Sequence, residues 1–182
     1  LSMMQLVRES KRASAKRRTW KLKGKSIPPF LIASITTQCN LHCKGCYARA
    51  HQACVENDNK DILSHQLSAV NWADLFSQAA ELGVSFILLA GGESFMRKDV
   101  LLAAGARKEI LFPVFTNGTM MDDAGLDLLC RHRNLIPVLS MEGNEETTDR
   151  RRGRGVNGQL LDAMVRLKDR EILFGASVTV HK

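Results

Sequence analysis

Residues 30–47 have the sequence FLIASITTQCNLHCKGCY, an apolar stretch that leads directly into three closely spaced cysteines. The stretch 30–36 combines aliphatic, β-branched and aromatic residues, so it predicts a β-strand. The cysteines then lie on a loop at the carboxyl end of that strand. Because α/β proteins bind ligands at this end of their strands, residues 37–47 are the first candidate for a functional loop.

Short β-rich runs and helical stretches alternate along the rest of the chain. Strands are predicted at 30–36, 85–90, 111–115, 135–140 and 172–180, and helices at 65–82, 99–107, 122–132 and 159–170. Gly83 follows the first of these helices, where a glycine suits the residue just past a helix end. Strands that alternate with helices of about ten residues form βαβ units around a parallel sheet. The sequence therefore predicts an α/β fold.

Each of the first four predicted strands is followed by a polar motif. These motifs are residues 37–47, Gly91-Gly92-Glu93, Thr116-Asn117-Gly118 and Ser140-Met141-Glu142-Gly143. The carboxyl ends of parallel strands meet at one edge of a sheet, so the four motifs are expected to lie side by side and to form one ligand site.

The cysteine spacing indicates a metal centre. Cys39, Cys43 and Cys46 place three thiolates on one short loop. A closed zinc site needs four ligands, usually from two separated pairs, and the candidates for a fourth zinc ligand are His42, His51 and Cys54. Three thiolates on a cubane iron–sulfur cluster leave one iron open to another ligand. The spacing favours iron–sulfur and leaves zinc as the alternative.

Residues 39–47, CNLHCKGCY, resemble the signature of the radical S-adenosylmethionine (radical SAM) superfamily, which is Cys-x3-Cys-x2-Cys with an aromatic residue near the last cysteine. The Gly-Gly-Glu, Thr-Asn-Gly and Ser-x-Glu-Gly motifs match the family in order and place. Residues 148–155, TDRRRGRG, resemble its Arg-Gly segment before the next helix. The resemblance covers roughly residues 29–182.

The resemblance implies a partial (βα)6 barrel of the TIM-like type with a cluster at its mouth. About five βα units are present, and a sixth strand is missing after residue 182. We therefore expect a truncated member of the family, or a fold that another chain completes. Residues 28–182 are predicted to be the radical SAM core domain, incomplete at its carboxyl end, and residues 1–27 a basic arm or helix.

The resemblance also implies an activity. Cys39, Cys43 and Cys46 would hold a [4Fe–4S] cluster whose open iron is chelated by the amino and carboxylate groups of S-adenosylmethionine. One electron from the reduced cluster would cleave the sulfonium to methionine and a 5′-deoxyadenosyl radical, which abstracts hydrogen from an unknown substrate. An electron donor such as flavodoxin or ferredoxin is implied as a partner.

Contacts with the methionine part of the cofactor follow from the same resemblance. Gly91, Gly92 and Glu93 are expected to receive its amino group. Arg152 is expected to pair with its carboxylate, because a guanidinium fork matches a carboxylate.

Contacts with the nucleoside part of the cofactor are implied as well. Ser140 and Glu142 are expected to face the ribose, and Asn117 to lie beside the cofactor. Tyr47 is expected to pack by the cluster and adenine, and Val178 to line the adenine.

The net charge of +7 is concentrated at the start of the chain. Residues 1–25 carry nine lysines and arginines against Glu9, which leaves the rest of the chain at −1. Such a segment can make weak contact with nucleic acid or an anionic surface. The alternative, which the lack of aromatic residues and glycines among the charges favours, is a solvated amphipathic helix with Met4, Leu6 and Val7 as anchors.

The sequence argues against a membrane protein and against a secreted, disulfide-rich protein. No apolar run approaches the length of a membrane span, and no secretory signal is visible. Five cysteines, an odd number, argue against a secreted disulfide framework, so we predict a cytoplasmic protein. Two alternative functions remain beside the enzyme: a non-catalytic scaffold that holds a cluster or zinc, and an RNA-binding module that uses the basic segment.

Overall fold

A five-stranded parallel sheet forms the centre of the computed structural model, which describes residues 3–51 and 66–179. Its strands are β1 (Phe30–Thr36), β2 (Phe86–Gly91), β3 (Phe112–Thr116), β4 (Leu135–Met141) and β5 (Gly175–Val178). They lie in the order β1-β2-β3-β4-β5, and every neighbouring pair is parallel. Neighbours in the sequence are thus neighbours in the sheet, as in a barrel wall. The predicted α/β fold with five parallel strands is confirmed.

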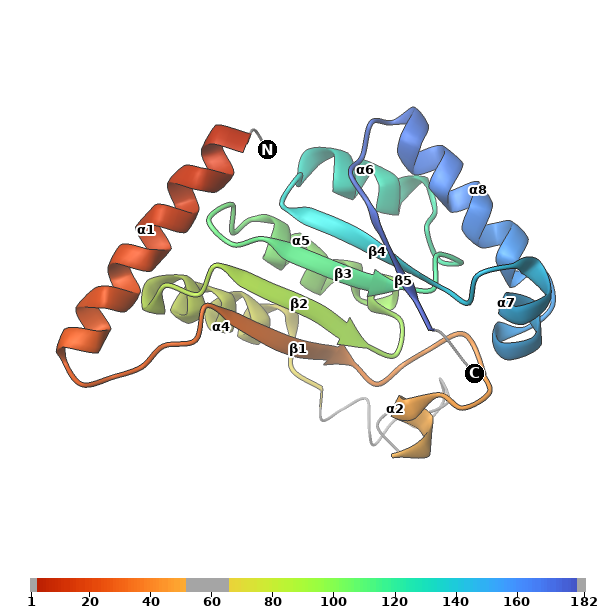
Figure 1. The fold of residues 1–182 in the computed structure, drawn as a ribbon, viewed down its shortest axis with the longest axis horizontal. Coiled ribbons are helices and arrows are strands. Elements are labelled where there is room, and N and C mark those ends of the chain that lie inside the picture. Colours follow the sequence, from red (N-terminus) through yellow and green to blue (C-terminus); the bar gives the residue numbers. More distant parts are fainter. Residues whose placement is uncertain (1–2, 52–65, 180–182) are drawn as a thin grey trace.

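Helices cover one face of this sheet (Figure 1). In chain order, the helices are α1 (Met3–Leu22), α2 (Tyr47–Ala50), α4 (Ala69–Leu82), the short 3-10 helix η1 (Ser94–Arg97), α5 (Lys98–Gly105), α6 (Asp123–Arg131), α7 (Glu145–Arg152) and α8 (Val156–Asp169). Behind the sheet lie α4, α5, α6 and α8. The cysteine-bearing loop, α2 and α7 lie at the carboxyl ends of the strands, and α1 lies at the opposite end.

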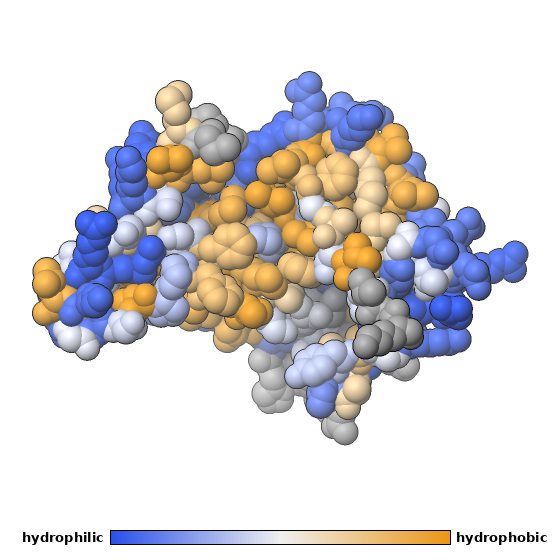
Figure 2. Space-filling view, in the orientation of Figure 1, coloured by the Kyte–Doolittle hydropathy of each residue, from blue (hydrophilic) through white to orange (hydrophobic). Residues whose placement is uncertain are grey.

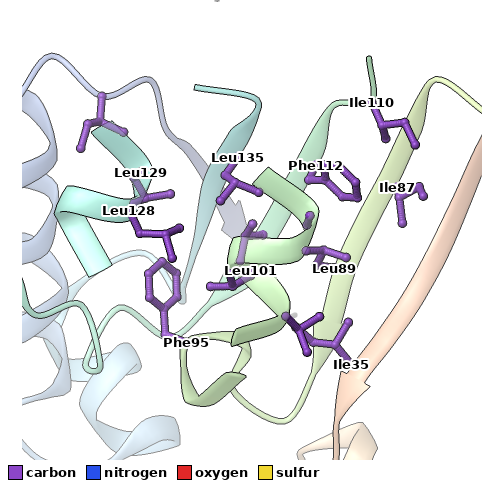
Figure 3. Packing of buried hydrophobic residues seen from close by; sticks show 14 of the residues in the cluster. Ile35, Ile87, Leu89, Phe95, Leu101, Ile110, Phe112, Leu128, Leu129 and Leu135 are labelled. Carbon is purple, nitrogen blue, oxygen red and sulfur yellow. The ribbon is translucent and has the colours of Figure 1, made fainter. Parts of the chain in front are cut away.

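The hydrophobic core fills the space between the sheet and these helices. Strand residues such as Leu89 and Phe112 point toward Leu101 of α5 (Figure 3), and all three are fully buried. Burying a side chain of this size stabilises the fold by roughly 1.5–3 kcal/mol. The core therefore holds the strands in place and fixes the edge at which the motifs meet.

No helix of residues 3–51 and 66–179 covers the other face of the sheet, which is apolar (Figure 2). Phe30 and Ile32 of β1 pair in register with Phe86 and Leu88 of β2, so alternation places all four on this open face. Phe30 and Ile32 are 51% and 66% exposed. The sheet is thus packed against helices on one face, and its other face is not covered by any of the described helices.

The first core helix is shorter than the predicted 65–82. Helix α4 begins at Ala69 because Ser68 caps it: the Ser68 hydroxyl accepts from the Asn71 N–H, and the Asn71 side chain accepts from the Ser68 N–H, both at 3.2 Å. The helix ends at Gly83 as predicted, with a left-handed φ of 92°. His65 lies outside the described residues.

The boundaries of two further elements differ from the prediction. Helix α8 begins at Val156, one turn before residue 159, and β5 covers only Gly175–Val178 of the predicted 172–180. Helix α7 was not predicted, because its sequence, EETTDRRR, has no apolar periodicity. It begins where the Asn144 side chain accepts from the Thr147 N–H at 2.9 Å.

Helix α1 packs on the end of α4. Lys16 Nζ donates to the Ala80 carbonyl at 2.8 Å, and Arg17 Nη1 donates to the Gly83 carbonyl at 2.5 Å. Ala13 is buried at this contact, and a Cβ on Gly83 would lie 2.6 Å from the Ala13 carbonyl oxygen. Cations at the carboxyl end of a helix also complement its dipole. The basic segment is therefore a helix fixed to the core.

Of the three predicted anchors of this helix, Leu6 is half-buried, and the other two are wrong. Met4 is 82% exposed and Val7 is 47% exposed. The contact is made one to three turns later, through a small residue and two cationic side chains. Cationic side chains can anchor a helix because their long stems pack while their heads reach backbone carbonyls.

Neither α1 nor any other helix of residues 3–51 and 66–179 has both the length and the apolar character needed to cross a bilayer.

Candidate functional site

The cysteine loop, defined as residues 37–46, connects the end of β1 to α2. Its three cysteines are all half-buried. Within residues 3–51 and 66–179, no three His, Cys, Asp or Glu side chains lie in a group that could hold a metal ion. The three thiols thus share one loop without converging on one point.

Burial and two nearby cations act in opposite directions on the cysteine loop. Burial raises the pKa of the Cys43 thiol, and the nearby Arg152 guanidinium opposes this shift most strongly. A negative charge on Cys46 raises the pKa of Cys43 further, and Arg151 lowers it. Burial therefore outweighs the two cations, and the pKa of the Cys43 thiol is raised overall. The donor set fits an iron–sulfur cluster in kind, and the loop must close further to bring the thiols together.

Gly91 and Gly92 let the end of β2 approach the cysteine loop. Gly92 N–H donates to the Thr36 carbonyl at 2.9 Å, and Glu93 N–H donates to the Gln38 carbonyl at 2.7 Å. A Cβ on Gly92 would lie 1.9 Å from that Gln38 oxygen, and Gly91 has a φ of 140°. Only glycine fits this close backbone approach.

The Glu93 carboxylate joins the ends of β2 and β3. It is buried, and it accepts hydrogen bonds from Phe95 N–H at 2.9 Å, Thr116 Oγ1 at 2.7 Å and Asn117 N–H at 2.8 Å. Burial raises the pKa of Glu93, while the Asn117 and Phe95 N–H groups oppose the shift. Glu93 thus holds the site together, and its contact with a methionine amino group stays a prediction.

Asn117 connects β3 to the cysteine loop. Its Nδ2 donates to Asn40 Oδ1 at 2.9 Å, and Asn40 Nδ2 donates to Thr119 Oγ1 at 2.8 Å. Thr119 N–H closes the ring by donating to Asn117 Oδ1 at 2.9 Å. Asn40 and Thr119 were missed by the sequence analysis; the one available signal was the position of Asn40 between two cysteines.

Glu142 binds two arginines of α7. Arg151 Nη1 donates to Glu142 Oε1 at 2.6 Å, and Arg152 donates to the same oxygen through Nη2 at 2.8 Å and Nε at 3.1 Å. The Glu142 side chain is 2% exposed. Arg152, predicted to bind the cofactor, is therefore at the site. Arg151 was not predicted, and it also contacts the cysteine loop.

The remaining predicted site residues lie at the same edge and are more open. Tyr47 is 77% exposed, with its ring centre 4.4 Å from that of His51. Ser140 is half-buried and pairs in register with Ser177 of β5, and Val178 is 52% exposed. Their cofactor contacts stay predictions.

The two other cysteines lie away from this group. Cys130 packs against the hydrophobic core, as expected of a small apolar residue. Cys54 lies outside the described residues.

The sequence profile of the Radical SAM superfamily matches residues 33–181. The chain belongs to the radical SAM superfamily. Among curated relatives, Fe-coproporphyrin III synthase of Methanosarcina barkeri (strain Fusaro / DSM 804) is 32% identical over 87% of this chain and 39% of the relative. The chain thus spans about two fifths of that relative's length.

Solved structures show the same fold. Streptococcus suis SuiB bound to its precursor peptide SuiA superposes with a TM-score of 0.74 and 21% identity, over 93% of this chain and 37% of SuiB. SuiB bound to S-adenosylmethionine superposes with a TM-score of 0.72 and 20% identity, over 93% of this chain and 39% of SuiB. The fold of this radical SAM chain is therefore the partial barrel of these proteins, over part of their length.

Proposed function

We propose that the chain is the catalytic core segment of a radical SAM enzyme, in which Cys39, Cys43 and Cys46 hold a [4Fe–4S] cluster beside bound S-adenosylmethionine. The observation that carries this proposal is the set of hydrogen bonds joining the cysteine loop to the other motifs. Gln38, Asn40 and Lys44 of the loop are bonded to the Gly-Gly-Glu turn, the Thr-Asn-Gly turn and helix α7. A superfamily match over residues 33–181 supports the same assignment.

When bound, the reduced cluster supplies the electron that cleaves the sulfonium of S-adenosylmethionine. Arg152 orients the methionine carboxylate, and it already lies beside the cysteine loop, since its charge acts on Cys43. Gly91 and Gly92 bring backbone groups close to the loop, where Glu93 fixes the turn for the methionine amino group.

The nucleoside end of the cofactor is proposed to lie toward β4 and β5. Ser140 and Glu142 face the ribose, with Asn117 beside the cofactor, while Tyr47 and Val178 border the adenine. Support for this arrangement is the exposure of Tyr47 and Val178 at the carboxyl edge, which leaves their apolar surfaces free to pack on a ligand.

Two kinds of partner fit the charges of the described residues. An electron donor such as flavodoxin or ferredoxin reduces the cluster, and the exposed Lys44 of the cysteine loop favours an acidic docking surface. Helix α1 makes weak contact with nucleic acid or an anionic surface through exposed residues such as Lys11 and Arg18.

The substrate is proposed to be selected by segments outside the region shared with the relatives. The matched relatives are named for a coproporphyrin in one case and solved with a precursor peptide in another. The shared region makes up 39% and 37% of those proteins, so the same core serves different substrates.

Anaerobic reconstitution with iron and sulfide tests the proposal. The reconstituted chain is reduced with dithionite in the presence of S-adenosylmethionine, and 5′-deoxyadenosine is followed by chromatography. We expect product from the unaltered chain, none from Cys43→Ala, and an unchanged yield from Cys130→Ala, which removes a thiol remote from the loop.

The other outcomes separate the alternatives. A cluster that forms without any 5′-deoxyadenosine would indicate a non-catalytic scaffold. Zinc bound in preference to iron would contradict the proposal. An RNA affinity that falls steeply with salt and does not depend on S-adenosylmethionine would favour the RNA-binding alternative.

A further inference from the structure

Arg151 holds the cysteine loop through both its backbone and its side chain. The Lys44 N–H donates to the Arg151 carbonyl at 2.7 Å, and Arg151 Nε donates to the Lys44 carbonyl at 3.2 Å. Lys44 lies between Cys43 and Cys46. The peptide groups on both sides of Lys44 are therefore bound to one residue, which lies more than a hundred positions later in the chain.

The same guanidinium is fixed from its other side. Arg151 Nη1 donates to Glu142 Oε1 at 2.6 Å and to Thr179 Oγ1 at 3.0 Å. The Arg151 side chain is 24% exposed, against 2% for Glu142. Because a guanidinium is planar and offers donors in fixed directions, these bonds set the direction of Nε toward the loop. Arg151 thus joins the cysteine loop to the ends of β4 and β5.

The middle of the loop has little packing of its own. His42, Lys44 and Gly45 are exposed, and a Cβ on Gly45 would have no atom within 4 Å. With so few apolar contacts, the position of this part of the loop depends on hydrogen bonds, and Arg151 provides two of them.

The neighbouring arginines of α7 do not duplicate these contacts. Arg150 pairs with Glu146 on the helix surface at 3.7 Å, where both side chains are mostly exposed. Arg152 donates to Glu142 from two nitrogens. Successive helix residues point about 100° apart, so only the middle arginine of the three reaches Lys44.

We propose that Arg151 is a positioning residue that fixes the Cys43–Cys46 half of the cysteine loop, so that the three thiolates close around a cluster at this edge of the sheet. The inference rests on the proposed function, because it takes the loop to be a cluster site. Arg151 acts through the Lys44 peptide groups rather than by ligating iron. Residues that position metal ligands in this way typically change metal affinity by about 10- to 100-fold when removed.

Cluster retention is the direct test. The unaltered chain, Arg151→Ala, Arg151→Lys and the control Arg150→Ala are reconstituted anaerobically, and iron release to a chelator is timed. We expect Arg151→Ala to lose iron about 10- to 100-fold faster and to show an altered electron paramagnetic resonance spectrum of the reduced cluster. Arg151→Lys should not restore retention, because an ammonium lacks the fork that spans Lys44, Glu142 and Thr179. Arg150→Ala should match the unaltered chain.

A second measurement keeps the test independent of the cluster and of variant folding. Amide hydrogen exchange of the unaltered, iron-free chain should show the Lys44 N–H protected and the neighbouring Gly45 N–H fast. Equal exchange at both amides would overturn the proposal, as would unchanged iron release in a folded Arg151→Ala variant. If the unaltered chain binds no iron while the Lys44 amide is protected, the proposed function fails and the contact of Arg151 with the loop stands.

Discussion

Gly92 lies where the end of β2 passes closest to the cysteine loop. A Cβ there would meet the Gln38 carbonyl oxygen at 1.9 Å and its carbon at 2.4 Å. Both are backbone atoms, so no side-chain rotation relieves the contact. We expect Gly92→Ala to lower the free energy of unfolding by about 1–3 kcal/mol, measured by urea denaturation of the iron-free chain.

A glycine without neighbours provides the matched control for Gly92. Gly158 lies in α8 with no atom within 4 Å of a built Cβ. Gly158→Ala should leave the free energy of unfolding unchanged or raise it by about 0.5–1 kcal/mol, since alanine is the better helix former. Equal stability of both variants would show that the β2 approach to the loop tolerates a side chain.

Glu93 is expected to matter for folding as well as for the cofactor. Its two oxygens accept from three donors, and the amide nitrogen of a glutamine would face at least one of them. An unsatisfied buried donor costs about 1–3 kcal/mol. Glu93→Gln should therefore lower the free energy of unfolding of the iron-free chain by that amount, whereas Glu81→Gln on the exposed surface of α4 should not.

The pH dependence of stability gives a second readout for Glu93. Burial raises the pKa of Glu93 in the folded state, so the folded chain holds this proton more tightly than the unfolded chain, whose glutamate has a pKa of about 4.3. The contribution of Glu93 to stability then falls as pH rises from that value through the folded pKa. This fall should be absent in Glu93→Gln, and its persistence there would assign it to another group.

Single residues of the site were predictable only where a motif carries them. Gly92, Glu93 and Asn117 stand in short motifs after strands, so their place at the edge followed from the strand pattern. Arg151 stands in a run of three arginines, and which of them reaches Lys44 depends on the rotation of a helix that has no sequence signal. Asn40 is polar in a polar loop, and only the fold brings it to Asn117.

Asp149 joins α7 to α8 at the scale of elements. Its carboxylate accepts from Asn157 N–H at 2.8 Å and Gly155 N–H at 2.6 Å, which lowers its pKa, with Arg154 adding a smaller effect. An asparagine side chain offers one acceptor oxygen instead of two. Asp149→Asn should therefore lower the thermal midpoint at neutral pH, measured by circular dichroism.

The sign of the Asp149 effect follows from its lowered pKa. The stabilisation is present above the unfolded aspartate value of about 3.9 and is lost as pH falls through the folded pKa. The difference between Asp149→Asn and the unaltered chain should thus shrink as the solution is acidified below about pH 4. Asp162→Asn on the exposed side of α8 is the control. A difference that stays constant with pH would show that the charge of Asp149 plays no part.

Helices and strands whose apolar residues recur at regular spacing were predictable from the sequence. Helix α7, whose sequence is polar, was not. The four core helices and five strands appear close to their predicted positions because burial of one face imposes a period on their sequences. Helix α7 is held by the Asn144 cap and by the bonds of its arginines, which are tertiary contacts. Helix α4 begins later than predicted because Ser68 and Asn71 form a capping box that sets its first residue at Ala69.

At the scale of the whole molecule, the order of the strands was the most predictable feature. Alternating strands and helices with short connections favour sequential parallel neighbours, and the sheet follows that order. The docking of α1 was not predictable, because it uses Ala13, Lys16 and Arg17 against the end of α4 rather than an apolar stripe. Composition showed the charge of this helix without showing which cations bind carbonyls.

The exposed apolar face of the sheet should cause the chain to self-associate. Phe30 and Ile32 are more than half exposed on edge strand β1, and they continue the apolar face of β2 (Figure 2). Apolar patches and unpaired strand edges promote association. We expect the 182-residue chain to bind the dye ANS and to sediment as larger species with rising concentration.

Replacing Phe30 and Ile32 together by lysine should weaken both signals, because charged side chains on an edge strand oppose pairing. Val165→Lys changes an equally exposed valine on α8, away from the sheet face, and should leave both signals unchanged. Weakening by both variants alike would assign the association to net charge rather than to the open face.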